Sequence, residues 1–317
     1  MEETRKDALT DRRGIILIPY AEKKNSQSGE NIKADANTRA DLYFKNCCVA
    51  AISARKHNDD HTDVALVTDI QVPPKYEKLL QSNGVLVIQQ DFDTFCFADN
   101  YTWSLAFYKL CAVYKVVQQF PYDYYAYLDS DVYVQSDFSP IWKECDDHIL
   151  LYDINHGLQV EHYRSFLSEV EQFTKEKVQI TQFGGEFFAA NRASAAAFLE
   201  TCMGVYLQMK ETGFVTVHGD EFIISLAAAK HENVKNAGAY VYRFWTGTFR
   251  LVSTSYHFNP VVVLHVPAEK EAGMLVLYRK YISKGKCPKN QKVYRILHLK
   301  HRSVKTVIKD IYKKIRK

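Results

Sequence analysis

The sequence predicts an α/β protein built on a mostly parallel sheet that is flanked by helices. Two observations carry this prediction. Short apolar stretches of strand length alternate with longer stretches of helical periodicity over the first part of the chain. The strand candidates are also continuously apolar, as expected of strands that are covered on both faces. With 317 residues, of which 47% are hydrophobic, the chain is long enough to bury a full core.

The expected elements follow one another in a regular order. The stretch "GIILIPY" is the first strand, and a polar loop over 22–38 follows it. The stretch "PPKYEKLLQSNG" starts on proline and stops on glycine, as helices tend to do. In chain order we expect a strand at 14–20, a helix at 39–55, a strand at 63–69, a helix at 73–84, a strand at 85–90, a helix at 103–119, a strand at 122–129, a strand at 184–191, helices near 192–211 and 219–230, and a strand at 259–267.

Charge is unevenly distributed along the chain. The formal net charge is +4, but residues 279–317 hold 15 Lys and Arg against one acid, whereas the rest holds 26 bases against 36 acids. The sequence therefore predicts a folded domain over 1–278 and a basic tail over 279–317.

The tail has the pattern of an amphipathic helix. Its apolar residues recur at helical spacing, and lysines occupy the remaining faces. Such a helix binds anionic membrane surfaces. A tail helix packed on the body would show the same pattern, so this alternative stays open. The acidic body and the lack of a nucleic-acid-binding motif indicate that nucleic acid is not a partner.

The compartment expected from the sequence is the cytoplasm, with peripheral attachment at the inner face of the membrane. The first residues, "MEETRKDALTDRRG", are charged and lack the apolar core of a signal peptide. No apolar run approaches the roughly 20 residues that span a bilayer. The seven cysteines are scattered without zinc-site spacing, which indicates reduced thiols.

Two acids, Asp129 and Asp131, directly follow the apolar strand "YYAYL". Carboxylates separated by one residue leave a strand on the same side, where both can bind one hard cation. Without a partner they would repel each other and resist burial. A strand-end turn supported by Ser130 is the alternative without a function.

This stretch resembles the GT-A glycosyltransferases, and within them the retaining family typified by bacterial lipopolysaccharide galactosyltransferases and glycogenin. Lys109 in a helix, the segment "YLDSDVYV" and the segment "DFSPIW" carry the resemblance, which covers roughly residues 14–267 and is strongest over 105–142. It implies a GT-A, Rossmann-like fold, a nucleotide-sugar donor with UDP as the expected nucleotide, a Mn²⁺ or Mg²⁺ cofactor, and transfer with retention to a glycan or lipid-linked acceptor.

The resemblance also implies the metal ligands. Asp131 would bind the cation directly, and Asp129 would contact the cation or the ribose. His265, at the end of the strand "VVVLH", would be the third ligand, and Lys270 would meet a phosphate. The glycine of the matching family segment is missing here, where the chain has Pro267 and Ala268.

Other family positions match more loosely. Asp220 and Glu221 would reach the reacting sugar as catalytic residues, with Asp220 preferred, although acids at a helix start need no function. Lys109 would contact the donor, with a solvent-facing lysine as the alternative. The further residues expected to bind the nucleotide sugar are Pro19, Tyr20, Asp129, Ser130, Gly184, Gly185 and Glu186.

Two rival functions remain at this point. A nucleotidyltransferase would use a similar sheet and similar acids, but the loop "IPYAEKKN" lacks the glycines expected of its phosphate loop. A non-catalytic protein that binds a nucleotide sugar with the same fold is the other alternative.

Overall fold

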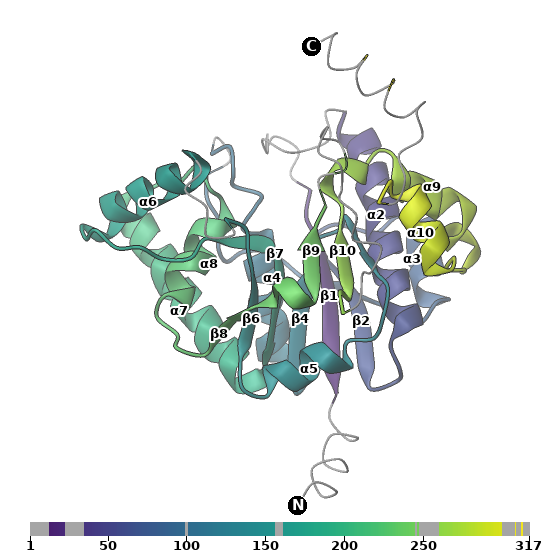
Figure 1. The fold of residues 1–317 in the computed structure, drawn as a ribbon, viewed down its shortest axis with the longest axis horizontal. Coiled ribbons are helices and arrows are strands. Elements are labelled where there is room, and N and C mark those ends of the chain that lie inside the picture. Colours follow the sequence, from purple (N-terminus) through teal and green to yellow (C-terminus); the bar gives the residue numbers. More distant parts are fainter. Residues whose placement is uncertain are drawn as a thin grey trace, which may run out of the picture.

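The computed structural model describes residues 13–22, 35–98, 101–155, 161–244, 246, 260–299, 308 and 312. A seven-stranded sheet forms the centre of the molecule, and helices lie on both of its faces (Figure 1). Its strands are β1 (Gly14–Tyr20), β2 (Thr62–Thr68), β3 (Leu86–Gln89), β4 (Tyr124–Leu128), β6 (Ile149–Asp153), β7 (Phe183–Asn191) and β8 (Val234–Asn236). The helices are α2 (Ala36–His57), α3 (Pro74–Gln81), α4 (Tyr108–Gln119), α5 (Ser139–Cys145), α6 (Glu161–Thr174), α7 (Arg192–Thr212), α8 (Asp220–Ala228), α9 (Gly273–Lys280) and α10 (Asn290–Ile296).

The strand order is β3-β2-β1-β4-β7-β6-β8. Strands β1 to β4 pair in parallel, and β6 pairs in parallel with β8. Strand β7 pairs antiparallel with both β4 and β6, so it runs against the rest of the sheet. The predicted class, an α/β domain with a mostly parallel sheet between helices, is confirmed, and it is the arrangement expected of a GT-A, Rossmann-like domain.

Alternate side chains of each central strand enter two separate cores. Ile16 and Ile18 of β1 pack in the core that contains α2, α3, α9 and α10, whereas Ile15 and Leu17 pack in the core that contains α4, α6, α7 and α8. Figure 1 shows α2, α3, α9 and α10 on one side of the sheet and α6, α7 and α8 on the other. Because β1 is buried on both faces, its sequence is continuously apolar.

A second sheet of three short strands lies beside the first. Its strands are β5 (Val132–Val134), β9 (Val241–Arg243) and β10 (Val263–His265), in the order β5-β10-β9. The strand expected at 259–267 is therefore shorter and belongs to this small sheet. Strand β10 pairs antiparallel with β5, in a register that sets His265 opposite Val132. His265 is thereby brought next to Asp131, across more than 130 residues of sequence.

Several elements differ from the sequence-based expectation. Helix α4 begins at Tyr108 rather than at 103, because the residues before it form turns. Strands β5, β8 and β9 and helices α5, α9 and α10 were not expected. Each has three to eight residues, too few for a hydrophobic period to stand out. Strand β6, which has five residues, was also missed, and so was the longer helix α6, which has 14.

Packing on the body continues beyond the predicted domain boundary at residue 278, which falls inside α9. Ile282, Val293, Tyr294 and Leu297 are buried in the same core as α2 and β5. The amphipathic stretch 303–317 lies outside the described residues, apart from Ile308 and Tyr312, whose side chains are exposed. Among the described helices, none has the length and apolar character needed to cross a membrane.

The close packing of Gly14 against Trp142 offers a test of this fold. A Cβ atom at Gly14 would lie 2.7 Å from the Trp142 ring, which is held by a hydrogen bond from its Nε1 to Thr62 Oγ1. We expect Gly14→Ala to lower the free energy of unfolding by about 1–3 kcal/mol, as overpacking does. Gly204 in α7 is the matched control, because a methyl group added there would meet nothing within 4 Å. Gly204→Ala should instead raise stability by up to about 1 kcal/mol, and urea unfolding of both variants measures the contrast.

Candidate active site

The site lies at the carboxyl edge of the parallel strands. Strand β1 ends there at Tyr20, and β4 ends there just before Asp129. Because β7 runs the opposite way, its first residues reach this same edge, and the Asp129 backbone N–H donates a hydrogen bond to the Glu186 carbonyl at 3.1 Å. Ligands of open α/β sheets bind at this edge.

A cavity of about 420 Å³ opens at this edge. Most residues expected to have a role line it, and they come from segments spread over 250 residues of sequence. Pro19 and Gly184 do not line it; Gly184 instead leaves room for the Glu186 side chain, since a Cβ there would lie 1.8 Å from Glu186 Oε2. The expected residues that line the cavity are Tyr20, Lys109, Asp129, Ser130, Asp131, Gly185, Glu186, Asp220, Glu221, His265 and Lys270.

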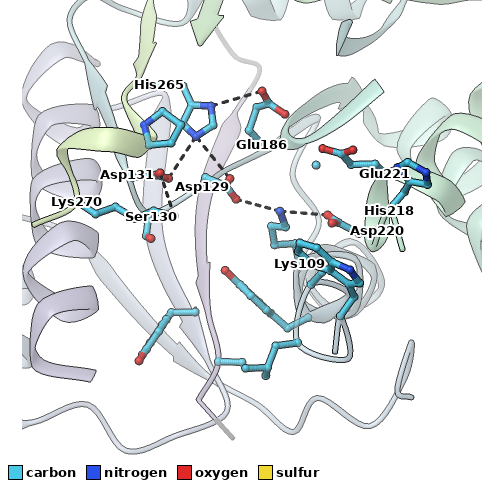
Figure 2. A pocket seen from close by; sticks show the side chains of 18 of the residues that line it. Lys109, Asp129, Ser130, Asp131, Glu186, His218, Asp220, Glu221, His265 and Lys270 are labelled. Carbon is cyan, nitrogen blue, oxygen red and sulfur yellow. Dashed lines mark hydrogen bonds and ion pairs between the residues drawn. The ribbon is translucent and has the colours of Figure 1, made fainter. Parts of the chain in front are cut away.

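Asp131 and His265 form the first polar cluster of the cavity (Figure 2). The Val266 N–H donates to the Asp131 carbonyl at 3.0 Å, which continues the pairing of β10 with β5 and aligns the two side chains. His265 Nε2 lies 3.4 Å from Asp131 Oδ1 and 3.7 Å from Asp129 Oδ2. Lys270 Nζ lies 3.3 Å from Asp131 Oδ2. The structure thus brings together the four residues predicted to hold metal and phosphate.

Charge balance decides the protonation of this cluster. Burial by itself would raise the pKa of Asp131, but Lys270 and His265 hold it well below its ordinary value. Burial would likewise lower the pKa of His265, but Asp131 and Glu186 raise it to about 9. The cluster is therefore made of mutually compensating buried charges.

The residues present fit a divalent cation. Asp129, Asp131 and His265 each offer a ligand atom, and these atoms all lie within 4.8 Å of one another. Asp131 Oδ2 and His265 Nδ1 are buried atoms that make no hydrogen bond, although each has an ion-pair partner, Lys270 Nζ at 3.3 Å and Glu186 Oε1 at 3.4 Å. Two carboxylates and one imidazole suit Mn²⁺ or Mg²⁺.

Lys109 connects this cluster to the other side of the cavity. Its Nζ lies 3.1 Å from Asp129 Oδ1 and 3.1 Å from Asp220 Oδ2. Although burial favours the neutral amine, the two carboxylates raise the pKa of Lys109 well above its ordinary value. Lys109 is thus a buried cation that faces the cavity and not a solvent-facing lysine.

Asp220 occupies the first turn of α8. It is 5% exposed, and Gly185 makes its approach to β7 possible, because a Cβ at Gly185 would lie 2.0 Å from Asp220 Oδ2. Burial raises the pKa of Asp220 to about 6, with Lys109 acting in the opposite direction. A carboxyl with this pKa changes its protonation near neutral pH.

The buried Glu186 pairs with the partly buried Arg243, an arginine that was not among the residues expected at the site. Arg243 donates two hydrogen bonds of 2.6 Å to the Glu186 carboxylate, whose Oε1 also lies 3.4 Å from His265 Nδ1. Burial would raise the pKa of Glu186, but Arg243 and His265 lower it to about 2. Arg243 lies at the end of the three-residue strand β9, whose sequence gives no signal that it would meet the site.

His162, His218 and Glu221 form the second polar cluster of the cavity, and the two histidines were also missed. The imidazole rings of His162 and His218 meet edge to face at 4.7 Å between centroids. Glu221 Oε2 accepts a hydrogen bond from Gln182 Nε2 at 3.2 Å. Burial, together with His162, lowers the pKa of His218 to about 4, so this imidazole is neutral at neutral pH. His218 lies two residues before Asp220, and that proximity was the available signal.

Aromatic side chains form the wall near the end of β1. Tyr20 stacks on Tyr43 of α2 with ring centroids 5.4 Å apart, and its hydroxyl donates to Glu22 Oε2 at 2.7 Å. Lys270 Nζ lies 5.9 Å from the centroid of the Tyr43 ring. The end of β1 therefore places two aromatic side chains in the cavity lining, close to the Asp131 cluster.

The comparisons with known proteins add little to this geometry. No model of a known protein family matches the chain, and no curated protein matches it either. A similar solved structure is described as an active-site mutant of LgtC; it is 16% identical, the match covers 80% of this chain and 86% of that one, and the TM-score is 0.49. At this identity and TM-score the likeness says nothing about what this chain binds or does.

The raised pKa of Asp220 predicts a pH effect on stability. The folded state binds this proton more tightly than the unfolded state, so the stability from Asp220 is complete below pH 3.8 and is lost as pH rises through about 6. Asp220→Asn removes this loss. We expect the free energy of unfolding of the variant to rise relative to wild type by about 2–3 kcal/mol across that window.

The measurement is urea unfolding at a series of pH values, with a chelator present. Asp60→Asn is the control, because the Asp60 side chain is fully exposed. A difference between Asp220→Asn and wild type that does not change with pH would contradict the assignment of the raised pKa to Asp220.

Proposed function

We propose that this protein is a metal-dependent glycosyltransferase that moves a sugar from a nucleotide sugar, with UDP as the expected nucleotide, to a glycan or lipid-linked acceptor. The observation that carries the proposal is the convergence of Asp129, Asp131 and His265 at the carboxyl edge of the sheet, in the cavity that also holds Lys109 and Asp220. The sequence resemblance over 105–142, which includes Lys109, Asp129 and Asp131, also supports it.

The charged residues have complementary tasks in this proposal. Asp129, Asp131 and His265 would hold Mn²⁺ or Mg²⁺, which stabilises the negative charge that develops on a diphosphate leaving group. Lys270 lies beside Asp131 and would bind a phosphate oxygen. Tyr20 and Tyr43 would contact the nucleoside from the aromatic wall.

The donor sugar would lie between this cluster and α8. Gly185 allows the Asp220 carboxylate to pack against β7 at the cavity, and Glu221 follows on the same helix. In the retaining family that the sequence resembles, the acid near the sugar supports positive charge on it, and we assign this task to Asp220. Inversion would instead need a carboxylate that takes the acceptor proton. The anomeric configuration of the product, determined by NMR, distinguishes retention from inversion.

Removal of one metal ligand tests the activity. We expect Asp131→Asn to lower cation-dependent turnover of the nucleotide sugar by at least about 100-fold, since a catalytic cation contributes several kcal/mol of charge stabilisation. Turnover is measured as release of the nucleoside diphosphate with Mn²⁺ and with chelator, over a panel of nucleotide sugars. Asp147→Asn, at an exposed position outside the cavity, is the matched control and should keep wild-type turnover.

Two results would contradict the proposal. One is turnover by the Asp131→Asn variant at the wild-type rate. The other is a wild-type protein that is stabilised against heat by a nucleotide sugar but never cleaves it, which would identify a binding protein instead. Circular dichroism of the variant verifies that it is folded.

For the tail we propose attachment to an anionic membrane surface, which would bring the enzyme to a lipid-linked acceptor. Deletion of residues 303–317 should lower binding to vesicles that contain anionic lipid, and the wild-type binding should fall as salt rises. Turnover on soluble acceptors should not change. Equal vesicle binding before and after deletion would contradict this attachment.

A further inference from the structure

His218 is buried without a hydrogen-bond partner for either ring nitrogen. The residue is 5% exposed, and neither Nδ1 nor Nε2 is hydrogen-bonded. Buried polar groups are normally paired, and an unpaired one is a sign of a missing ligand. The side chain lines the cavity (Figure 2), so a ligand can reach it from there.

The local structure holds His218 rigidly in this position. Its backbone N–H donates to Thr216 Oγ1 at 3.0 Å, and Thr216 in turn donates to Glu169 of α6. The ring packs edge to face on Phe166 of α6, with centroids 5.5 Å apart. Gly219 follows with a positive φ of 60°, which allows the chain to turn into α8. The orientation of the imidazole is therefore determined by its surroundings before any ligand binds.

Two further donors meet His218 at this point. His162, one helical turn before Phe166 on α6, and Glu221 of α8 each offer a ligand atom, and the three ligand atoms lie within 4.8 Å of one another. Gln182 Nε2 lies 2.9 Å from His162 Nε2 and 3.2 Å from Glu221 Oε2, so its amide holds these two side chains together. Glu221 Oε1 lies 3.8 Å from Arg243 Nη2, whereas Glu221 Oε2 lies 3.9 Å from His162 Nε2.

We propose that His162, His218 and Glu221 form a second metal site, which takes a cation of the Zn²⁺ class. Two imidazoles and one carboxylate are a known donor set for Zn²⁺, with a fourth position left to a water or ligand. All three residues line the cavity, so the fourth position would be open to its contents. An oxygen atom of an acceptor or of another anionic ligand is the chemical group suited to that position.

This site is distinct from the Asp129, Asp131 and His265 cluster. Figure 2 shows His218 and Glu221 on the side of the cavity away from Asp131 and His265, with Lys109 and Asp220 between the two groups. The two clusters share no residue. The donor sets also differ, because the first is rich in carboxylate and the second in imidazole, which prefers borderline metals such as Zn²⁺ and Co²⁺. The second site therefore does not depend on the proposed function.

The test is the number of Co²⁺ or Zn²⁺ ions that the full-length chain binds, measured by titration calorimetry on metal-free protein. Three proteins are compared: wild type, His162→Ala and Asp131→Asn. His162 is suited to substitution because its side chain is 57% exposed. We expect His162→Ala to bind one ion fewer than wild type, and Asp131→Asn to keep the ion that His162→Ala loses.

The visible absorption of bound Co²⁺ identifies the ligands. The Asp131→Asn variant should retain the absorption band of one Co²⁺ ion. When His162→Ala or His218→Asn is combined with Asp131→Asn, this band should disappear, or the affinity for the ion should fall by at least about 10-fold. His61→Ala, at an exposed position outside the cavity, is the matched control and should change neither stoichiometry nor absorption. Thermal unfolding of each variant shows whether it is folded, and His162→Ala serves where a substitution at the buried His218 disturbs the fold.

The outcomes separate the two sites. Equal stoichiometry in wild type and His162→Ala, together with loss of all binding in Asp131→Asn, would overturn the second site and leave the first. Loss of the ion in His162→Ala together with its retention in Asp131→Asn supports the second site whether or not the protein transfers sugar. Absence of Co²⁺ and Zn²⁺ binding in folded wild-type protein would overturn it outright.

Discussion

Four carboxylates lie at one edge of the sheet, and their burial constrains the rest of the structure. Asp131, Glu186 and Asp220 are at most 5% exposed, and Asp129 is only partly exposed. Buried carboxylates of like charge destabilise a fold unless cations meet them at close range. Each cationic side chain that pairs with these four carboxylates comes from a different segment of the chain. Each ion pair therefore connects a further segment to this edge of the sheet.

The cations are spread widely over the sequence. Lys109 comes from α4, Arg243 from β9, and His265 from the end of β10. Lys270 follows directly after the short turn that succeeds β10, and its backbone carbonyl accepts a hydrogen bond from Asn46 of α2 at 3.2 Å. The small sheet, α2 and α4 are thus held in place by the same set of charges that faces the cavity. Because the charges nearly compensate one another, a ligand or cation that enters must reorganise the pairs already present.

The two sides of the cavity differ in electrostatic character. Around Asp131 and His265 the groups are charged, because each lies beside a partner of opposite sign. Around His218 the imidazole is neutral, because burial and His162 both disfavour its protonation. Lys109 stands between the sides and pairs with one acid from each. The two sides of the cavity therefore offer a ligand different electrostatic environments.

The sequence by itself determined the strands β1, β2, β3, β4 and β7 of the large sheet and the acidic half of the site. The strand that ends at Leu128 was recognisable from its apolar run, and the two acids after it from their spacing, because both signals are local. His265, Lys270, Asp220 and Glu221 were named through a family resemblance, and the structure places all four on the cavity.

Only the tertiary structure decided how these residues meet. The reversal of β7 brings Glu186 to the edge, the register of β10 with β5 sets His265 beside Asp131, and α6 carries His162 to His218. These contacts join residues that lie far apart in the sequence, and no local pattern of the chain encodes them, since they depend on strand direction, register and the pairing of buried charge.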